Sequence, residues 1–322
     1  MSGVFANRTN AIGIASAIGA SIMFSINDVT IKFLSGDYPL HEVVFVRSTL
    51  GMVLILAFLI PLSGGFAQLR TKRLGVHIIR GLCVVFANMS FFLGLAAMPL
   101  ADAVAIFFVS PLVITAFSVI FLRETVGPRR WAAVGMGMIG VLIVMRPGSA
   151  AFQLASLFPL AAAVGYAFLH ILTRKIGGTE TATTMTFYIQ LVFIIVSAGI
   201  GLAFGDGRLA GSGDPSLEFL LRAWVMPDAG DFWLMALLGL ASAVGGYLIT
   251  QAYRLCEAGL AAPFEYVALP MGIFWGFTVF GEWPDSTTWV GVALIMAGGL
   301  YMFWRETQAD RPIAGKSPPK RR

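Results

Sequence analysis

The chain has 322 residues, of which 57% are hydrophobic and only 12% are charged. Soluble globular domains carry roughly 25% charged residues, so this composition excludes an ordinary soluble domain and favours a membrane protein. The net charge of +5 is explained by the membrane topology described below, and it gives no argument for a nucleic-acid partner.

The charged residues are separated by long uncharged runs, such as the 19 residues between Arg8 and Asp28. A run of about 20 residues spans a hydrocarbon core of roughly 30 Å at about 1.5 Å per residue. The sequence therefore predicts an all-α polytopic membrane protein. In chain order its ten expected transmembrane helices are 11–33, 40–62, 75–98, 102–122, 130–146, 151–173, 182–204, 231–253, 259–280 and 286–304.

The second half of the chain repeats the first. An offset of 143 pairs Lys32 with Lys175, and later in each half an offset of 158 pairs Glu124 with Glu282. Because each half holds five spans, an odd number, the second half enters the membrane from the opposite side. The expected organisation is a cytoplasmic N-terminus (1–10), two inverted five-helix repeats (11–146 and 151–304), and a disordered basic cytoplasmic tail (305–322).

Lysine and arginine set the expected orientation. With the N-terminus in the cytoplasm, 16 of these residues fall on cytoplasmic segments and four on outside segments. Cytoplasmic loops of membrane proteins carry such an excess. Both termini are therefore expected in the cytoplasm of a bacterial cell, with the chain crossing its inner membrane repeatedly.

Several motifs resemble catalytic or cofactor sites. Residues 135–140 spell G-x-G-x-x-G, but they lie inside an apolar span, without the preceding strand and the later acidic residue of a dinucleotide site. We interpret them as small residues that let helices approach closely. His41, His77 and His170 lack the spacing of metal ligands. No cofactor, metal or catalytic residue is predicted.

One group of polar residues lies at membrane depth on the first two spans. Charges inside a span cost a few kcal/mol or more, so they usually face a cavity or a partner. Asp28 and Lys32 share one helix face, with Asn27 beside them, and Asp28 and Arg47 lie at similar depth, which allows them to pair. Two readings stay open: an anchor or gate for a charged substrate group, or a structural pair that fixes the hairpin.

A second group is Glu265 with Tyr266 on the ninth span, between Pro263 and Pro270. Proline removes a backbone donor and disturbs the helix, which exposes carbonyl groups that a cavity or polar neighbours must satisfy. We expect an unpaired carboxylate at Glu265 and treat it as a candidate for proton or cation coupling. A purely structural role is the alternative.

Further polar residues within the spans are candidates for substrate binding or gating, with interhelical hydrogen bonding as the alternative for each. They are Asn88, Ser110, Tyr166, His170, Tyr188, Gln190, Tyr247 and Gln251.

The ends of the two halves resemble EamA-type repeats of the drug/metabolite transporter superfamily. The matching residues are Pro111, Glu124, Trp131 and Gly140 in the first half and Pro270, Glu282, Trp289 and Gly298 in the second. The resemblance implies a central cavity lined mainly by spans one to four and six to nine, with spans five and ten peripheral. Within the superfamily, Asn27-Asp28, His77 to Gly81 and Trp283 to Thr287 are similar to S-adenosylmethionine uptake carriers, and related members carry riboflavin or amino-acid metabolites.

The leading hypothesis is a secondary carrier that moves a small organic metabolite by alternating access. Tyrosine rings on the expected cavity helices favour a heterocyclic or zwitterionic substrate, such as S-adenosylmethionine or riboflavin. An amino-acid or drug/metabolite exporter of the same fold is the alternative. A polytopic membrane enzyme and a channel are the rivals of other classes. The expected partners are the substrate, the lipid bilayer and a coupling proton or ion, and a homodimer is compatible with these features.

Overall fold

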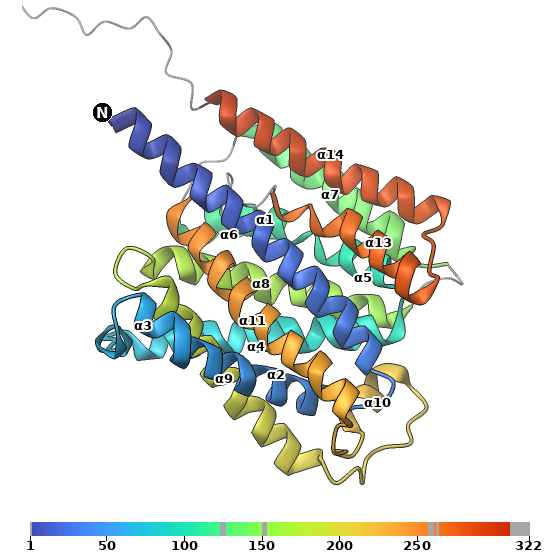
Figure 1. Ribbon diagram of the computed structural model, residues 1–322. Helices are drawn as coiled ribbons and strands as arrows, with labels where there is room; N and C mark the ends of the chain where they lie inside the picture. Colours follow the sequence, from blue (N-terminus) through green and yellow to red (C-terminus); the bar gives the residue numbers. More distant parts are fainter. Residues whose placement is uncertain (1, 123–126, 150–152, 257–260, 262–263, 310–322) are drawn as a thin grey trace, which may run out of the picture.

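The structure, a computed structural model, describes residues 2–122, 127–149, 153–256, 261 and 264–309. All regular secondary structure in these ranges is helical (Figure 1). Seven helices are long and apolar enough to cross a membrane, and three shorter apolar helices, 131–145, 268–280 and 286–301, complete the ten predicted spans. The chain is a multi-pass membrane protein.

Five spans form the first half. They consist of α1 (Ser2–Leu34), α2 (Leu40–Leu54) continued by a π-helical turn (Ile55–Leu59) and α3 (Ile60–Leu62), α4 (Leu74–Ala97), α5 (Leu100–Phe107) with α6 (Ser110–Leu122), and α7 (Pro128–Met145). The fourth span is interrupted between α5 and α6. Pro111 stands in the first turn of α6, where its missing N–H leaves no helical bond unmade.

The second half contains α8 (Leu157–Ile176), α9 (Ala182–Phe204), α11 (Ala229–Leu255), α13 (Ala268–Phe280) and α14 (Ser286–Ala309). A short helix, α10 (Pro215–Leu221), lies in the enlarged polar loop between α9 and α11. Side-chain caps start three of these helices: Thr181 accepts from the amide of Thr184, Asp214 from that of Leu217, and Asp228 from that of Asp231. The last helix continues to Ala309, five residues into the predicted tail, and residues 310–322 lie outside the described ranges.

The packing of the helices follows the sequence repeat. Helix α1 packs against α11, and α8, the counterpart of α1 in the second half, packs against α4, the counterpart of α11. Helices α7 and α14, the fifth and tenth spans, pack against each other on one side of the bundle (Figure 1). In both cases the first span of one half packs against the third span of the other half, which is the pattern that two related repeats produce. The predicted fold class is confirmed.

Glycines allow α7 and α14 to approach closely. A Cβ atom added at Gly140 would lie 2.7 Å from the backbone oxygen of Gly291, and one at Gly298 would lie 2.9 Å from that of Ala133. The G-x-G-x-x-G segment therefore lies at a helix–helix contact, as small residues do in membrane proteins.

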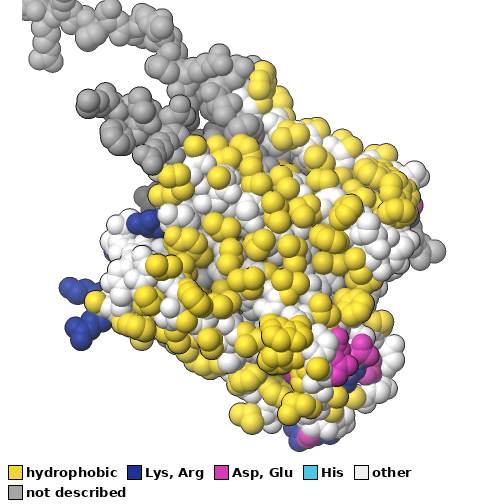
Figure 2. All heavy atoms as spheres, viewed as in Figure 1, with side chains coloured by type: hydrophobic (Ala, Val, Ile, Leu, Met, Phe, Trp, Pro, Cys, Tyr) yellow, Lys and Arg dark blue, Asp and Glu magenta, His cyan; other side chains and the backbone are white. Residues whose placement is uncertain are grey.

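Both ends of the chain lie at the same end of the bundle, because α1 begins where α14 finishes (Figure 1). We call this the terminal end. Figure 2 shows hydrophobic side chains spread across one face of the molecule, with charged side chains gathered at its edges. Exposed residues such as Phe58, Leu202 and Trp233 contribute to the apolar surface, which suits contact with lipid.

Candidate functional site

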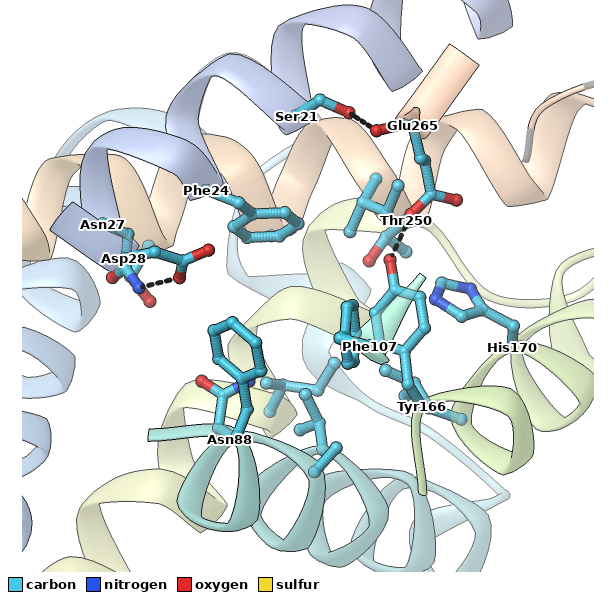
Figure 3. A pocket seen from close by; sticks show the side chains of 18 of the residues that line it. Ser21, Phe24, Asn27, Asp28, Asn88, Phe107, Tyr166, His170, Thr250 and Glu265 are labelled. Atoms are coloured by element: carbon cyan, nitrogen blue, oxygen red, sulfur yellow. Dashed lines mark hydrogen bonds between the residues drawn. The ribbon is translucent and has the colours of Figure 1, made fainter. Parts of the chain in front are cut away.

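A cavity lies in the middle of the bundle, between the two repeats (Figure 3). It encloses about 1130 Å³ of space not filled by atoms, a figure that includes open solvent. Its lining comes from α1, α2, α4, α5, α8, α9 and α11, from Phe108, and from the segment that contains Glu265 and Ala268. None of the described lining residues belongs to α7 or α14, so spans five and ten are peripheral, as the resemblance implies.

Arg47 on α2 is the central charged residue of the first repeat. Its side chain is 2% exposed. Its Nη1 donates to Asn27 Oδ1 at 2.8 Å and its Nη2 donates to Asn88 Oδ1 at 2.7 Å. The guanidinium lies 5.4 Å from the ring centre of Phe92 and 5.1 Å from that of Phe193, which adds cation–π attraction. Three spans thus hold this cation beside the cavity.

Asp28 lines the cavity but does not pair directly with Arg47. Its Oδ1 accepts a 3.4 Å hydrogen bond from Asn27 Nδ2, and Asn27 in turn accepts from Arg47. The expected pair is therefore bridged by an amide. Lys32 shares a helix face with Asp28 but bonds elsewhere: its Nζ lies 2.6 Å from Glu282 Oε1 and 2.9 Å from the carbonyl oxygen of Met98.

Glu265 is the central acidic residue of the second repeat, and it is not unpartnered, in contrast to the expectation. Its carboxylate accepts a 2.7 Å hydrogen bond from Tyr166 (Figure 3). It accepts a second one from Tyr253. His170 packs against both tyrosines, with ring centres 4.2 Å and 3.9 Å away. No described basic side chain forms an ion pair with Glu265. Pro263, expected beside it, lies outside the described residues.

Gln190 on α9 is the remaining candidate that lines the cavity. Its Nε2 donates to Ser242 Oγ at 3.1 Å, whereas its Oε1 has no hydrogen-bond partner among the described groups. The residues that line the cavity out of the predicted set are Asp28, Arg47, Asn88, Tyr166, His170, Gln190 and Glu265.

Five predicted residues do not line the cavity: Ser110, Tyr188, Tyr247, Gln251 and Tyr266. Tyr188 stacks on His77 with ring centres 4.6 Å apart and donates to the carbonyl oxygen of Leu69. Tyr266 packs on Phe108, and its hydroxyl lacks a hydrogen-bond partner within the described part of the chain. Tyr266 lies in a turn directly before α13, whereas Glu265, the residue before it, lines the cavity.

Other cavity residues were missed from the sequence. The carboxylate partner Tyr253 and the cavity residue Thr250 carried no signal beyond lying in an apolar helix. Arg80 was noted only as part of a family-like motif. Six phenylalanines contribute to the apolar wall. On an apolar span the sequence does not distinguish them from lipid-facing residues. The six phenylalanines are Phe24, Phe91, Phe92, Phe107, Phe108 and Phe193.

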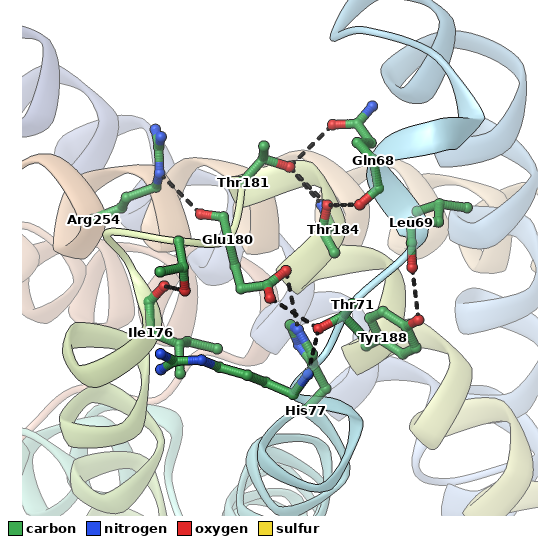
Figure 4. A network of polar contacts seen from close by, with 12 residues as sticks. Gln68, Leu69, Thr71, His77, Ile176, Glu180, Thr181, Thr184, Tyr188 and Arg254 are labelled. Atoms are coloured by element: carbon green, nitrogen blue, oxygen red, sulfur yellow. Dashed lines mark hydrogen bonds and ion pairs between the residues drawn. The ribbon is translucent and has the colours of Figure 1, made fainter.

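Polar contacts join the two repeats at the terminal end (Figure 4). Glu180, after α8, accepts a 2.8 Å hydrogen bond from Thr71, and its Oε2 lies 3.5 Å from His77 Nε2. Thr181 donates to Gln68 Oε1 at 3.0 Å. The loop between α8 and α9 is thereby tied to the segment before α4.

A different set joins the repeats at the opposite end. Besides the Lys32–Glu282 pair, Leu100 N donates to Glu282 Oε2 at 2.9 Å and Thr288 donates to Asp102 at 2.9 Å. Arg146 pairs with Asp285, and this contact holds the pKa of the Asp285 carboxyl below its ordinary value. Contacts between the repeats therefore exist at both ends, with the cavity between them.

The cavity contains no built metal site within the described part of the chain, where no three His, Cys, Asp or Glu side chains are grouped to hold an ion. Its chemistry is that of binding: a cation in an amide clamp, a carboxylate held by two phenols, and an aromatic wall. Such a site can orient a small molecule that has both charged groups and flat rings.

Residues 11–146 match the EamA-like transporter family. The resemblance to EamA-type carriers of the drug/metabolite transporter superfamily is confirmed. The chain is 28% identical to a riboflavin transporter of Rhizobium johnstonii, with 94% of each chain covered. It is also 28% identical to an S-adenosylmethionine uptake transporter of Rickettsia bellii, covering 94% of this chain and 97% of the relative.

The fold also matches a crystal structure with a TM-score of 0.66 at 18% identity, covering 94% of this chain and 99% of the other. At that identity the match concerns the fold alone. The EamA-type family and the named relatives indicate a transporter of small metabolites rather than an enzyme.

Proposed function

We propose that this protein is a secondary carrier that moves a small organic metabolite across a bacterial inner membrane by alternating access. The observation that carries the proposal is the central cavity, to which eight of the ten spans and both repeats contribute. Substrate sites of repeat-built carriers lie at the repeat interface near the middle of the membrane. Both termini are placed in the cytoplasm because of the uneven distribution of lysine and arginine.

Alternating access needs contacts that break at one end while those at the other end stay closed. The terminal end has the Glu180 contacts with Thr71 and His77, and the opposite end has the Lys32–Glu282 pair. These two sets share no residue. One can therefore open by a rocking of the repeats while the other holds.

The substrate we propose is heterocyclic or zwitterionic, of the kind that S-adenosylmethionine and riboflavin represent. Phenylalanine rings offer flat apolar contact, and they favour offset or edge-on packing with another ring. Arg47 and Glu265 place opposite charges on the cavity wall. The names of the relatives, a riboflavin transporter and an S-adenosylmethionine uptake transporter, support a metabolite of this class.

We further propose that Glu265 couples transport to a proton. The carboxylate is 6% exposed and bonded to two tyrosine hydroxyls, with no described cation paired to it. No described cation holds this carboxylate in its charged form, so it can take up and release a proton as access changes.

Counterflow in proteoliposomes tests the proposal. Vesicles that contain purified protein and unlabelled riboflavin or S-adenosylmethionine should accumulate the same labelled compound transiently and saturably. Arg47→Gln should reduce this uptake at least tenfold, whereas Arg208→Gln, in an exposed loop, should not. A flux that grows linearly with concentration would indicate a channel, and competition by sugars alone would contradict the substrate class. Net movement only out of right-side-out vesicles would favour the exporter.

A further inference from the structure

Arg80 on α4 is a buried cation in the cavity wall with few partners. Its side chain is 1% exposed. Its Nε donates to Thr173 Oγ1 at 3.1 Å, and its Nη1 has no hydrogen-bond partner among the described groups. Nor does any described carboxylate form an ion pair with Arg80. Arg80 lies six positions after the start of α4 at the terminal end, a depth of about 9 Å at 1.5 Å per residue.

The acidic residue on the neighbouring loop does not satisfy Arg80. Glu180 accepts from Thr71 and contacts His77 instead. Arg47 offers a useful contrast, since both of its Nη atoms donate to amide oxygens of the protein. Each arginine leaves one nitrogen without a partner among the described groups: Nε in Arg47, whose two Nη atoms are both bonded, and Nη1 in Arg80.

A second polar side chain in the same part of the cavity is also unpartnered. His170 is 2% exposed, and neither of its ring nitrogens has a hydrogen-bond partner among the described groups. It lies three residues before Thr173 on α8, so the two share a helix face. All three residues line the cavity. Arg80 and His170 therefore present donors that lack acceptors, whereas the Thr173 hydroxyl donates to the carbonyl oxygen of Leu169 at 2.8 Å and positions Arg80 by accepting from its Nε.

We infer that Arg80, with His170 and Thr173 beside it, forms a subsite for an anionic group of the substrate, a carboxylate or a phosphate. Burying a guanidinium is costly unless an acceptor compensates it. Carboxylate and phosphate oxygens match its planar set of donors. This inference rests on the proposed function and narrows the substrate to a compound that carries such a group.

Two pairs of probes test the subsite by binding to purified protein in nanodiscs. S-adenosylmethionine and its decarboxylated analogue differ by a carboxylate, and flavin mononucleotide differs from riboflavin by a phosphate. In at least one pair, the wild type should bind the compound that carries the extra carboxylate or phosphate about tenfold more tightly or better. Arg80→Gln should abolish that preference, and Arg80→Lys should restore part of it. The matched control Arg254→Gln removes a charge from an exposed residue near the terminal end and should preserve the preference.

The outcomes separate this inference from the proposed function. The subsite would be overturned if the wild type bound both members of each pair equally, or if folded Arg80→Gln kept the same preference. Neither result would contradict the proposed carrier function. Binding of none of the four compounds would contradict the proposed substrate class. In that case inorganic phosphate is the probe. If phosphate protects the wild type against thermal unfolding and does not protect Arg80→Gln, the subsite is upheld. Equal effects on both proteins would refute it.

Discussion

Lys32, near the end of α1, and Glu282, directly after α13, form a 2.6 Å ion pair that joins the first repeat to the second. The side chains are 11% and 28% exposed, so water screens the pair only partly. The equivalent of Lys32 in the second repeat is Lys175, which is exposed and makes no ion pair with a described residue. The equivalent acid, Glu124, lies outside the described residues. The Lys32–Glu282 contact lies at the end opposite the termini.

If this pair holds one end closed, reversing one charge should impair transport and reversing both should restore it. Lys32→Glu places two carboxylates together, because Glu282 remains, and we expect initial uptake to fall at least tenfold. The double variant Lys32→Glu with Glu282→Lys should recover a substantial fraction. Uptake rates in proteoliposomes at equal protein content measure both. Failure of the double variant to improve on Lys32→Glu, with both proteins folded, would argue against a closing contact.

Glu265→Gln should separate accumulation from exchange. Glutamine keeps the size and the acceptor oxygen but cannot bind and release a proton, so gradient-driven accumulation should be lost while substrate exchange persists in part. Uptake measured across a range of pH should become flatter in the variant. Glu218→Gln, on α10 in the loop before α11, is the control and should behave as wild type, because glutamine keeps an oxygen that can accept from the amides of Gly211 and Gly213. A pH dependence of Glu265→Gln that equals that of the wild type would rule out coupling at this carboxylate.

Gly140→Leu should destabilise the protein by separating α7 from α14. A Cβ atom there would meet the oxygen of Gly291 at 2.7 Å and Ile295 Cγ1 at 2.9 Å. Overpacking of this kind typically costs about 1–3 kcal/mol, which should appear as a lower melting temperature in detergent. Gly135→Leu in the same helix is the matched control, because nothing lies within 4 Å of the added atom. Equal melting temperatures for both variants would contradict this packing role.

The orientation prediction is tested by single cysteines in a background without Cys83 and Cys256. Cysteines at Ser212 and Lys72, both exposed in loops, should react from opposite sides of the membrane. An impermeant reagent should label Ser212→Cys in intact cells and Lys72→Cys only after the membrane is opened. The charge distribution motivates this expectation. Labelling of both in intact cells would mean that the two loops share a side.

Sequence reasoning predicted the spans well because hydrophobic length is a local property. An uncharged run such as 48–69 has to cross the bilayer wherever the rest of the chain goes. The glycines of α7 were also interpreted in agreement with the structure, since the absence of a preceding strand excluded a nucleotide site. The interrupted fourth span and the short α10 were not predicted, because an apolar run does not show where its helix will break.

The side chains of the candidate site depended on more than sequence. Charged residues at depth had to find a cavity or a partner, so the energetic cost of burial alone singled out Arg47, Asp28 and Glu265. Their partners lie far along the chain or on other spans: Asn88 for Arg47, and Tyr166 for Glu265. Tyr253, like Tyr188, is a tyrosine on an apolar helix, and only its position on α11 brings it to the carboxylate.

The sequence by itself determined that the chain is helical, crosses the membrane repeatedly and contains two related halves, because hydrophobicity, charge bias and repetition are properties of the order of residues. The tertiary structure decided which polar residues share the cavity. Helix rotation sets that choice: each position turns about 100° around the axis, so on α9 Gln190 lines the cavity and Tyr188, two positions earlier, does not. Rotation is fixed by packing between distant spans, such as α1 on α11 and α4 on α8, which no local pattern of residues encodes.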